Sequence, residues 1–219
     1  MSGYEVFHSQ LRDAVAKYPS LKIIRGHGPA FLKGTFDVVD DTGKQWDSFE
    51  IEIKPTANFP KAFPLLFEVG DKIPKIADWH IYEDKRNCCI TLPILENIFC
   101  KGGITIAQFI HHHVRPHLFN QAHRRAFGFY ANGEYDHGVL GKWQYYMALF
   151  GTASTTTIID YLKRCIGLKK CLNKKSKCFC GSDRRMRKCH YEVYAMLKAV
   201  DKSILSFELV ELRQSLQLS

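Results

Sequence analysis

The sequence lacks long uncharged apolar stretches: charged residues interrupt every apolar run in its 219 residues well before the roughly 18 to 20 positions that a membrane span needs. Its first residues carry neither a positively charged start nor an apolar run, so we expect no secretory signal and a cytoplasmic protein. It has no internal repeat, and no glycine-rich phosphate loop follows a strand-like run. We therefore expect any acyl group that the protein handles to be activated by another chain.

Eight cysteines are present, and without an export signal they indicate thiols, metal ligands or a nucleophile rather than disulfides. The net charge of +9 is unevenly spread, because the stretch from Lys163 to Lys188 contains many lysines and arginines and a single acidic residue, Asp183. Such a run suits a solvated basic face around a metal site. A weak contact with nucleic acid, or with an acidic protein surface, is the alternative.

Hydrophobic spacing predicts an α+β fold. Residues 4–18 have apolar positions three and four apart, as in an amphipathic helix that Pro19 ends. Three strand-like runs follow, at residues 31–39, 49–54 and 65–69. A helix followed by a meander of strands is typical of the α+β class.

The rest of the chain predicts helices around one long irregular stretch. We predict no regular element in residues 74–103, and then helices in the segments 104 to about 115, where Pro116 ends or kinks the helix, 140–150, 158–166 and from Tyr191 onward. Residues 151–157, Gly-Thr-Ala-Ser-Thr-Thr-Thr, are the expected linker. The predicted organisation is a domain at 1–150, this linker, and a helical segment at 158–219.

Residues 178–190 hold a candidate metal site. Cys178, Cys180, Cys189 and His190 offer three thiolates and one imidazole, and Gly181 allows the chain to reverse between the two pairs. The pattern resembles the SEC-C motif, a short zinc-binding module found in the bacterial protein-translocation motor and in other bacterial proteins. The resemblance and the full set of four ligands imply a structural Zn²⁺. Chance clustering of reduced cysteines is the alternative.

Other histidines and cysteines are weaker candidates. Consecutive positions on a helix diverge by about 100° each, so the run His111-His112-His113 predicts solvent-facing side chains rather than a metal site. We expect His137 to be structural and Cys165 to be a core residue, and Cys171 is left unassigned.

Four features occur in order in the middle of the chain: Phe59-Pro60 with Phe63-Pro64, then His80, then Cys88-Cys89-Ile90-Thr91-Leu92, then Gly102-Gly103-Ile104-Thr105-Ile106. After a helix and a strand meander, this order resembles the ubiquitin-conjugating enzyme family. Residues 133–146 further resemble bacterial members that are encoded beside a cyclic-oligonucleotide synthase in antiphage (CBASS-type) operons. The resemblance covers roughly residues 1–150 and implies the UBC-like fold.

The resemblance also implies site residues. It places the family's active-site cysteine on Cys89, with adjacent Cys88 as the alternative, and its His-Pro-Asn histidine on His80, which we expect to brace the loop. Tyr82 stands where the family has asparagine, and Arg86 stands where it has glycine. Lys85 and Arg86 would favour a thiolate. The competing interpretation is that both cysteines are buried core residues.

Three functions follow as hypotheses. The first is a cysteine-dependent transferase that carries an acyl group as a thioester on Cys89; the resemblance implies a protein partner, either a cyclic-nucleotide synthase or a ubiquitin-like C-terminus. The second is a non-catalytic binding scaffold of the same fold. The third is a nucleic-acid binder that uses the basic knuckle.

Overall fold

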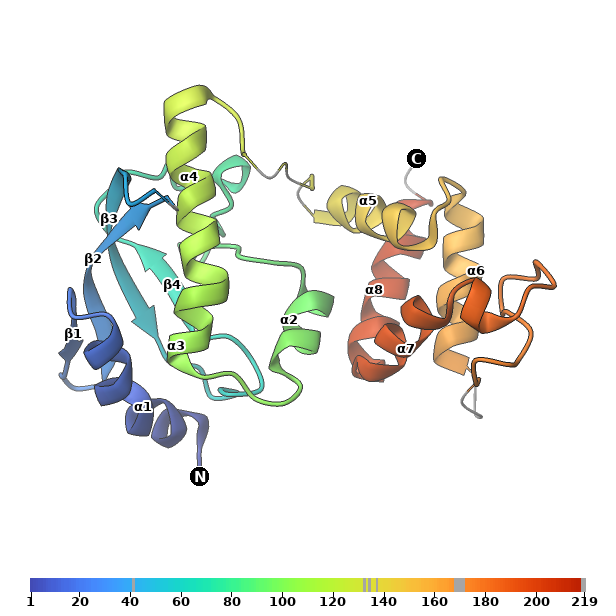
Figure 1. The fold of residues 1–219 in the computed structure, drawn as a ribbon, viewed down its shortest axis with the longest axis horizontal. Helices are drawn as coiled ribbons and strands as arrows, with labels where there is room; N and C mark the ends of the chain where they lie inside the picture. Colours follow the sequence, from blue (N-terminus) through green and yellow to red (C-terminus); the bar gives the residue numbers. More distant parts are fainter. Residues whose placement is uncertain (41, 132, 134, 137, 168–171, 218–219) are drawn as a thin grey trace. The chain divides into compact units, whose positions relative to one another are not determined.

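The computed structural model describes residues 1–219 except 41, 132, 134, 137, 168–171 and 218–219. The chain forms two compact units, residues 1–134 and 135–219, each with its own secondary structure (Figure 1). This division lies before the expected linker at 151–157, so the helix at 138–150 belongs to the second unit. The elements of the first unit are α1 (Gly3–Lys17), β1 (Leu21–Ile24), β2 (Phe31–Val39), β3 (Gln45–Lys54), β4 (Leu65–Glu68), the 3₁₀ turn η1 (Ala77–Trp79), α2 (Pro93–Cys100), α3 (Ile106–Phe109), the π-helical turn η2 (Ile110–Val114) and α4 (Arg115–Phe127).

The four strands of the first unit form one antiparallel sheet in the order β1-β2-β3-β4. Alternation along β3 gives the sheet two different faces, because Phe49, Ile51 and Ile53 are fully buried and the residues between them point the other way. On that opposite face Glu52 pairs with lysines of β2 and β3. The expected α+β class is therefore confirmed in its coarse form.

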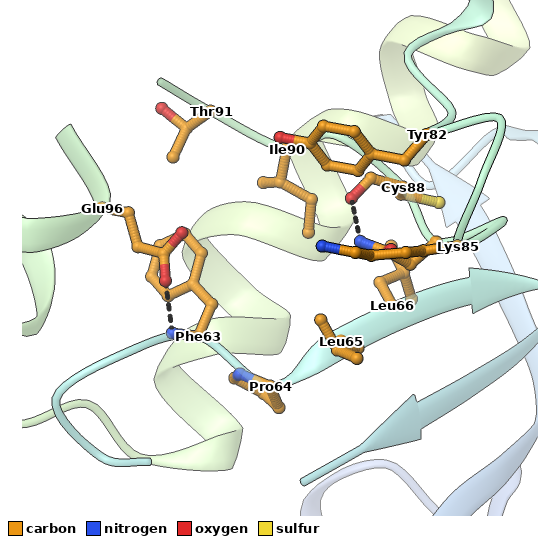
Figure 2. A pocket seen from close by; sticks show the side chains of 11 residues that line it. Phe63, Pro64, Leu65, Leu66, Tyr82, Lys85, Cys88, Ile90, Thr91 and Glu96 are labelled. Carbon is orange, nitrogen blue, oxygen red and sulfur yellow. Dashed lines mark hydrogen bonds between the residues drawn. The ribbon is translucent and has the colours of Figure 1, made fainter. Parts of the chain in front are cut away.

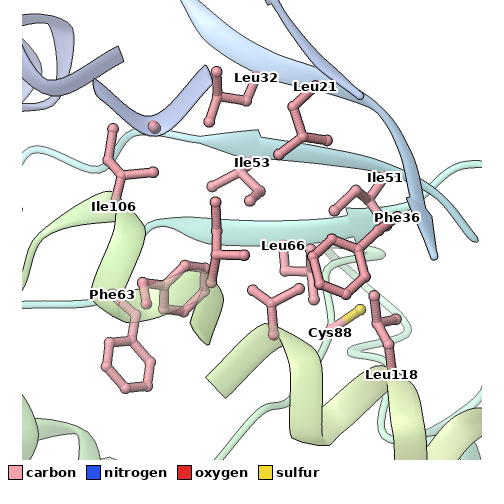
Figure 3. Packing of buried hydrophobic residues seen from close by; sticks show 14 of the residues in the cluster. Leu21, Leu32, Phe36, Ile51, Ile53, Phe63, Leu66, Cys88, Ile106 and Leu118 are labelled. Atoms are coloured by element: carbon pink, nitrogen blue, oxygen red, sulfur yellow. The ribbon is translucent and has the colours of Figure 1, made fainter. Parts of the chain in front are cut away.

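Helices cover the apolar face of this sheet. α1 contacts β1, β2 and α3, and α4 contacts β2 and β3. Ser2 begins α1 with a capping box, since its hydroxyl accepts the Glu5 amide while the Glu5 carboxylate accepts the Ser2 amide. The core lies between the layers and includes Leu66, Leu118 and Cys88 (Figure 3).

Three elements differ from the sequence-based prediction. β1 is a short strand of four residues that we did not predict, and α2 lies inside the stretch predicted to be irregular. The helical run that starts at Ile106 continues beyond Pro116 to Phe127. Proline is tolerated because it falls in the first turn of α4, directly after the wider π-helical turn η2, where its missing amide hydrogen costs least.

The second unit is helical. Its elements are α5 (Gly138–Phe150), α6 (Thr155–Gly167), the 3₁₀ turn η3 (Met186–Lys188), α7 (Tyr191–Ala199) and α8 (Lys202–Ser215). α6 contacts α5, α7 and α8, so only residues 151–154 of the expected linker connect two packed helices, and residues 155–157 form the first turn of α6. Between α5 and α8 the Tyr146 hydroxyl donates a hydrogen bond to the buried Glu208 carboxylate. None of the helices in the described part of the chain combines the length and apolarity that crossing a bilayer requires.

Candidate functional site

The two adjacent cysteines lie on the second arm of a small hairpin between β4 and α2. The hairpin is closed by a bridge between Ile81 and Cys88, and by a 3.0 Å hydrogen bond from the Tyr82 amide to the Asn87 carbonyl. At its tip Arg86 has φ 61°, in the left-handed region that favours glycine. The Cys88 amide donates to the Leu66 carbonyl of β4 at 2.8 Å, which fixes the hairpin to the edge of the sheet.

Because successive residues of an extended arm point to opposite sides, the two thiols have different surroundings. Cys88 is 4% exposed, and its side chain lies in the core near Phe36, Leu66 and Leu118 (Figure 3). Burial raises the pKa of Cys88 to about 12, so this sulfur is a neutral apolar core group. Cys89 is partly exposed. The interpretation of both cysteines as buried core residues thus fits Cys88 alone.

The Cys89 thiol has a raised pKa. Burial is the largest cause and the Glu96 carboxylate adds to it, while a hydrogen bond from the Tyr82 hydroxyl lowers the pKa in part. We expected Lys85 and Arg86 to favour the thiolate, and this expectation was wrong: Lys85 lines the neighbouring groove, the Arg86 guanidinium donates to the Lys75 carbonyl at 2.9 Å, and neither cation offsets the effect of burial on the Cys89 pKa. The Cys89 thiol is therefore predominantly protonated at neutral pH.

A shallow groove of about 210 Å³ lies on the Tyr82 side of the hairpin (Figure 2). Tyr82 joins the groove to Cys89, because it lines the groove and also donates a hydrogen bond to the Cys89 sulfur. The lining is mixed, with apolar residues from the segment before and in β4 and polar residues from the hairpin. The lining residues are Phe63, Pro64, Leu65, Leu66, Tyr82, Lys85, Asn87, Cys88, Ile90, Thr91 and Glu96.

Glu96 of α2 places a carboxylate at this groove. Its Oε1 accepts the Phe63 amide at 2.9 Å, which ties α2 to the segment before β4 (Figure 2). Burial raises the pKa of Glu96, and only that amide hydrogen bond opposes the rise. Sequence reasoning missed Glu96, because it lies on the helix that the pattern did not predict.

His80 acts on the hairpin through its backbone. It has φ 53° directly after η1, and its carbonyl oxygen accepts the Cys89 amide at 2.7 Å. Its ring packs against Tyr130, with 5.2 Å between ring centroids. This geometry fits the bracing role expected for His80.

Two side chains of α4, Gln121 and Arg124, contact η1, the turn that precedes the hairpin. Gln121 donates to the Trp79 carbonyl at 3.0 Å, and the Arg124 guanidinium lies between the rings of Trp79 and Tyr130, at 4.4 and 4.8 Å from their centroids. Arg124 also pairs with Asp78. His117 of the same helix is buried, and burial lowers its pKa to about 3, so its ring is neutral.

The second unit contains a candidate metal centre. Its four donor atoms all lie within 4.8 Å of one another, and they belong to Cys178, Cys180, Cys189 and His190. Three of the pairs are closer: Cys178 Sγ to His190 Nδ1 is 3.4 Å, Cys189 Sγ to His190 Nδ1 is 3.2 Å, and the sulfurs of Cys180 and Cys189 are 3.5 Å apart. This cluster could hold a metal ion with four protein ligands.

The surroundings of this cluster suit metal ligands. His190 presents Nδ1 to the sulfurs, while its Nε2 lies 3.4 Å from the Phe150 carbonyl, as expected for a ligating histidine whose other nitrogen is oriented by a carbonyl. Burial would raise the pKa of Cys180, but hydrogen bonds from Ser182 and the neighbouring thiols outweigh it and lower the pKa to about 6. A lowered thiol pKa favours the thiolate that metal binding needs.

The remaining candidates that the structure describes do not form sites. His111 and His112 are exposed in η2, as expected, whereas His113 packs on Phe63 with 4.4 Å between ring centroids. Cys165 is 1% exposed in α6, which confirms its expected place in the core. His137 and Cys171 lie outside the described residues.

No protein-family model, curated protein or solved structure matches this chain. The function is therefore inferred from the residues of the two sites.

Proposed function

We propose that the protein is a cysteine-dependent acyl transferase of the ubiquitin-conjugating type, with Cys89 as the residue that carries the acyl group. The observation that carries this proposal is the contrast between the two adjacent thiols. The Cys88 side chain is 4% exposed and packs in the core, although the residue lines the groove, while Cys89 is partly exposed and accepts a hydrogen bond from Tyr82, which lines that groove; Cys89 itself is not among the lining residues. A nucleophile that must meet another protein's C-terminus needs such a position.

The proposed reaction has two transfers. In the first, the Cys89 sulfur attacks the carbonyl carbon of an activated acyl donor, loses its proton to solvent, and the donor's leaving group departs. In the second, an amine of the acceptor attacks the Cys89 thioester, the C–S bond breaks, and the sulfur regains a proton. The Tyr82 hydroxyl donates to this sulfur and stabilises negative charge on it in both transfers.

Two backbone features support the resemblance to the family. The left-handed backbone at Arg86 is the conformation for which a glycine, the family's residue there, is best suited. The His80 carbonyl holds the Cys89 amide, so the histidine that corresponds to the family's His-Pro-Asn motif contacts the nucleophile's own backbone. Tyr82, in place of the asparagine, supplies a hydroxyl donor to the sulfur.

The partner in this proposal is a protein. The family resemblance favours a cyclic-oligonucleotide synthase or a ubiquitin-like C-terminus as the acyl donor, in bacterial antiphage defence. Because the sequence has no phosphate-binding loop, a second protein activates that C-terminus.

We further propose that the four-ligand cluster holds Zn²⁺ in a structural role. Zinc–sulfur bonds of about 2.3 Å separate the ligands of a tetrahedron by about 3.8 Å, close to the spacing of the cluster's donor atoms, which lie within 4.8 Å of one another. A set of four protein ligands leaves no position for a substrate. The ion's contribution is to hold residues 173–190 in their fold.

The experiment uses a short peptide activated at its C-terminus as a thioester, with intact-protein mass as the readout. Wild type and Cys88→Ala should gain the peptide's mass and lose it on treatment with hydroxylamine. Cys89→Ala should gain nothing, and Cys89→Ser should form an oxygen ester that resists thiols. An adduct that forms on Cys89→Ala as readily as on wild type contradicts the proposal.

The raised pKa of the Cys89 thiol also suits a second candidate, a non-catalytic scaffold of the same fold. The two candidates differ in a simple way. If the wild-type protein forms no thioester, and Cys89→Ala leaves capture of the protein partner and the biological activity intact, the scaffold is the better description.

A further inference from the structure

We propose that the second unit carries a binding surface for the phosphate backbone of double-helical nucleic acid, formed by residues 173–188 and here called the basic hairpin. This surface lies outside the Cys89 groove and does not depend on the transferase chemistry. All of its residues lie in the described part of the chain. It contains seven cationic side chains and one anionic one, and all eight are exposed: Lys174, Lys175, Lys177, Asp183, Arg184, Arg185, Arg187 and Lys188.

The pairing of the hairpin's two arms brings these cations together. Lys177 and Arg185 are bridge partners, so side chains eight residues apart in sequence lie side by side. The Arg187 amide donates to the Lys174 carbonyl at 3.1 Å, and the Arg185 guanidinium donates to the Lys175 carbonyl at the same distance. Each arm thus places its cations beside those of the other arm.

The same register turns the apolar side chains inward. Met186 is fully buried, and Cys178 and Phe179 are nearly so. Arg164 of α6 donates to the Phe179 carbonyl, which fixes the hairpin on the helices below it. The buried side chains and the Arg164 hydrogen bond therefore fix the backbone that carries the cations.

The charge of the hairpin is only slightly compensated. Asp183, the one acidic residue, pairs with Lys177 at 2.8 Å, and both side chains are about 80% exposed. Seven cations and one anion leave a net charge of 7 − 1 = +6 on sixteen residues. A bound zinc with three thiolates contributes about −1, so the surface stays strongly positive.

The absence of exposed apolar side chains decides between partners. None of residues 173–188 is an exposed large hydrophobic residue. Protein interfaces have an apolar centre, and stable anchoring to a membrane combines basic charge with apolar anchors. Single-stranded nucleic acid is held largely by stacking on aromatic rings. A duplex presents its phosphates outside and its bases stacked inside, and charge alone is enough to bind it.

The experiment measures binding of the full, zinc-loaded chain to a labelled 20-bp duplex by fluorescence anisotropy at several salt concentrations. The variant is Arg184→Gln/Arg187→Gln/Lys188→Gln. Its control, Arg12→Gln/Lys17→Gln/Lys22→Gln, removes the same charge from exposed positions of the first unit. Circular dichroism and zinc content establish that both variants remain folded.

We expect wild type and control to bind two unrelated duplex sequences equally, with affinity that falls steeply as salt rises. The hairpin variant should bind about tenfold or more weakly at low salt, with a salt slope reduced by about three. A DNA duplex and an RNA duplex of the same sequence are compared, to establish which of the two nucleic acids the basic hairpin binds more tightly. An equal loss of duplex affinity in the hairpin variant and the control would overturn the inference. So would binding only to polyglutamate, to vesicles with phosphatidylserine or to single-stranded nucleic acid.

Discussion

At the scale of single residues, Tyr82 and Glu96 act on the Cys89 thiol in opposite directions. The Tyr82 hydroxyl lowers the thiol pKa by donating to the sulfur, and the Glu96 carboxylate raises it by charge repulsion. Tyr82→Phe should therefore move the titration of Cys89 to higher pH, and Glu96→Gln should move it to lower pH. The glutamine side chain retains an oxygen that can accept the Phe63 amide.

The measurement is the rate of iodoacetamide alkylation at Cys89 against pH, read by peptide mass spectrometry. In wild type the rate should be slow at neutral pH and rise about tenfold per pH unit until the raised pKa is passed, because only the thiolate reacts. Cys88 serves as an internal control, since its buried thiol should stay unmodified until the protein unfolds. Shifts of the same sign in both variants would contradict this account.

The residues of the candidate sites were predictable to different degrees. The four metal-ligand candidates are close in sequence, so spacing alone identified the cluster that the structure brings together. The pKa of Cys89 was not predictable, because it depends on burial and on Glu96, which comes from a different element. Charged neighbours in sequence, Lys85 and Arg86, were a poor guide because Arg86 donates its hydrogen bond to the Lys75 carbonyl and neither cation lowers the Cys89 pKa.

At the scale of elements, the site depends on α4. Arg124 stacks between Trp79 and Tyr130 and holds η1, from which the chain leads to the His80 carbonyl that accepts the Cys89 amide. Arg124→Met keeps some packing but removes the cation. We expect it to lower the free energy of unfolding by about 1 kcal/mol and to speed hydrogen exchange at the Cys89 amide.

Urea denaturation and amide hydrogen exchange test this prediction together. Arg124→Lys is the matched variant, since it keeps the charge but loses the planar group that stacks on both rings. Exchange faster at Cys89 than in β3 would indicate local loosening of the hairpin. An unchanged Cys89 amide in Arg124→Met would mean that α4 does not hold the site.

Long periodic elements were predictable, and short or context-dependent ones were not. The spacing of Phe7 and Leu11 and the alternation of Phe49, Ile51 and Ile53 correspond to the buried faces of α1 and β3, whereas Val15 and Tyr18, predicted on the same face as Phe7, are only partly buried. β1 has four residues, too few for a period, and α2 is short and apolar, so pattern alone could not assign it. Pro116 was expected to end or kink the helix, but α4 continues through it, because the sequence gives no signal for the π-helical turn that precedes it.

At the scale of the whole molecule, the two units should respond differently to metal removal. If Zn²⁺ holds residues 173–190, a chelator should unfold that segment and lower the thermal stability of the second unit. The first unit has its own core of sheet and helices and should keep its stability. We expect differential scanning calorimetry to show one transition moving to lower temperature and one remaining in place.

Cys180→Ser provides a comparison without chelator, because it removes one of the four donor atoms. Its second-unit transition should resemble that of the chelated wild type, with less than one zinc per chain by elemental analysis. A chelator that shifts both transitions equally would show that the units do not unfold independently.

The cysteine pair lies on one arm of a hairpin that the Ile81–Cys88 bridge closes. Side chains alternate along this arm, so an odd or even number of residues in the turn decides which of the two sulfurs faces solvent. We expect the insertion or deletion of a single residue between the two arms to shift the pair by one position along the pleat, which would turn the Cys89 side chain inward and the Cys88 side chain outward. Under the proposed function, the doubled cysteine gives this hairpin a second candidate nucleophile that a change in the length of the turn, rather than a substitution, would expose.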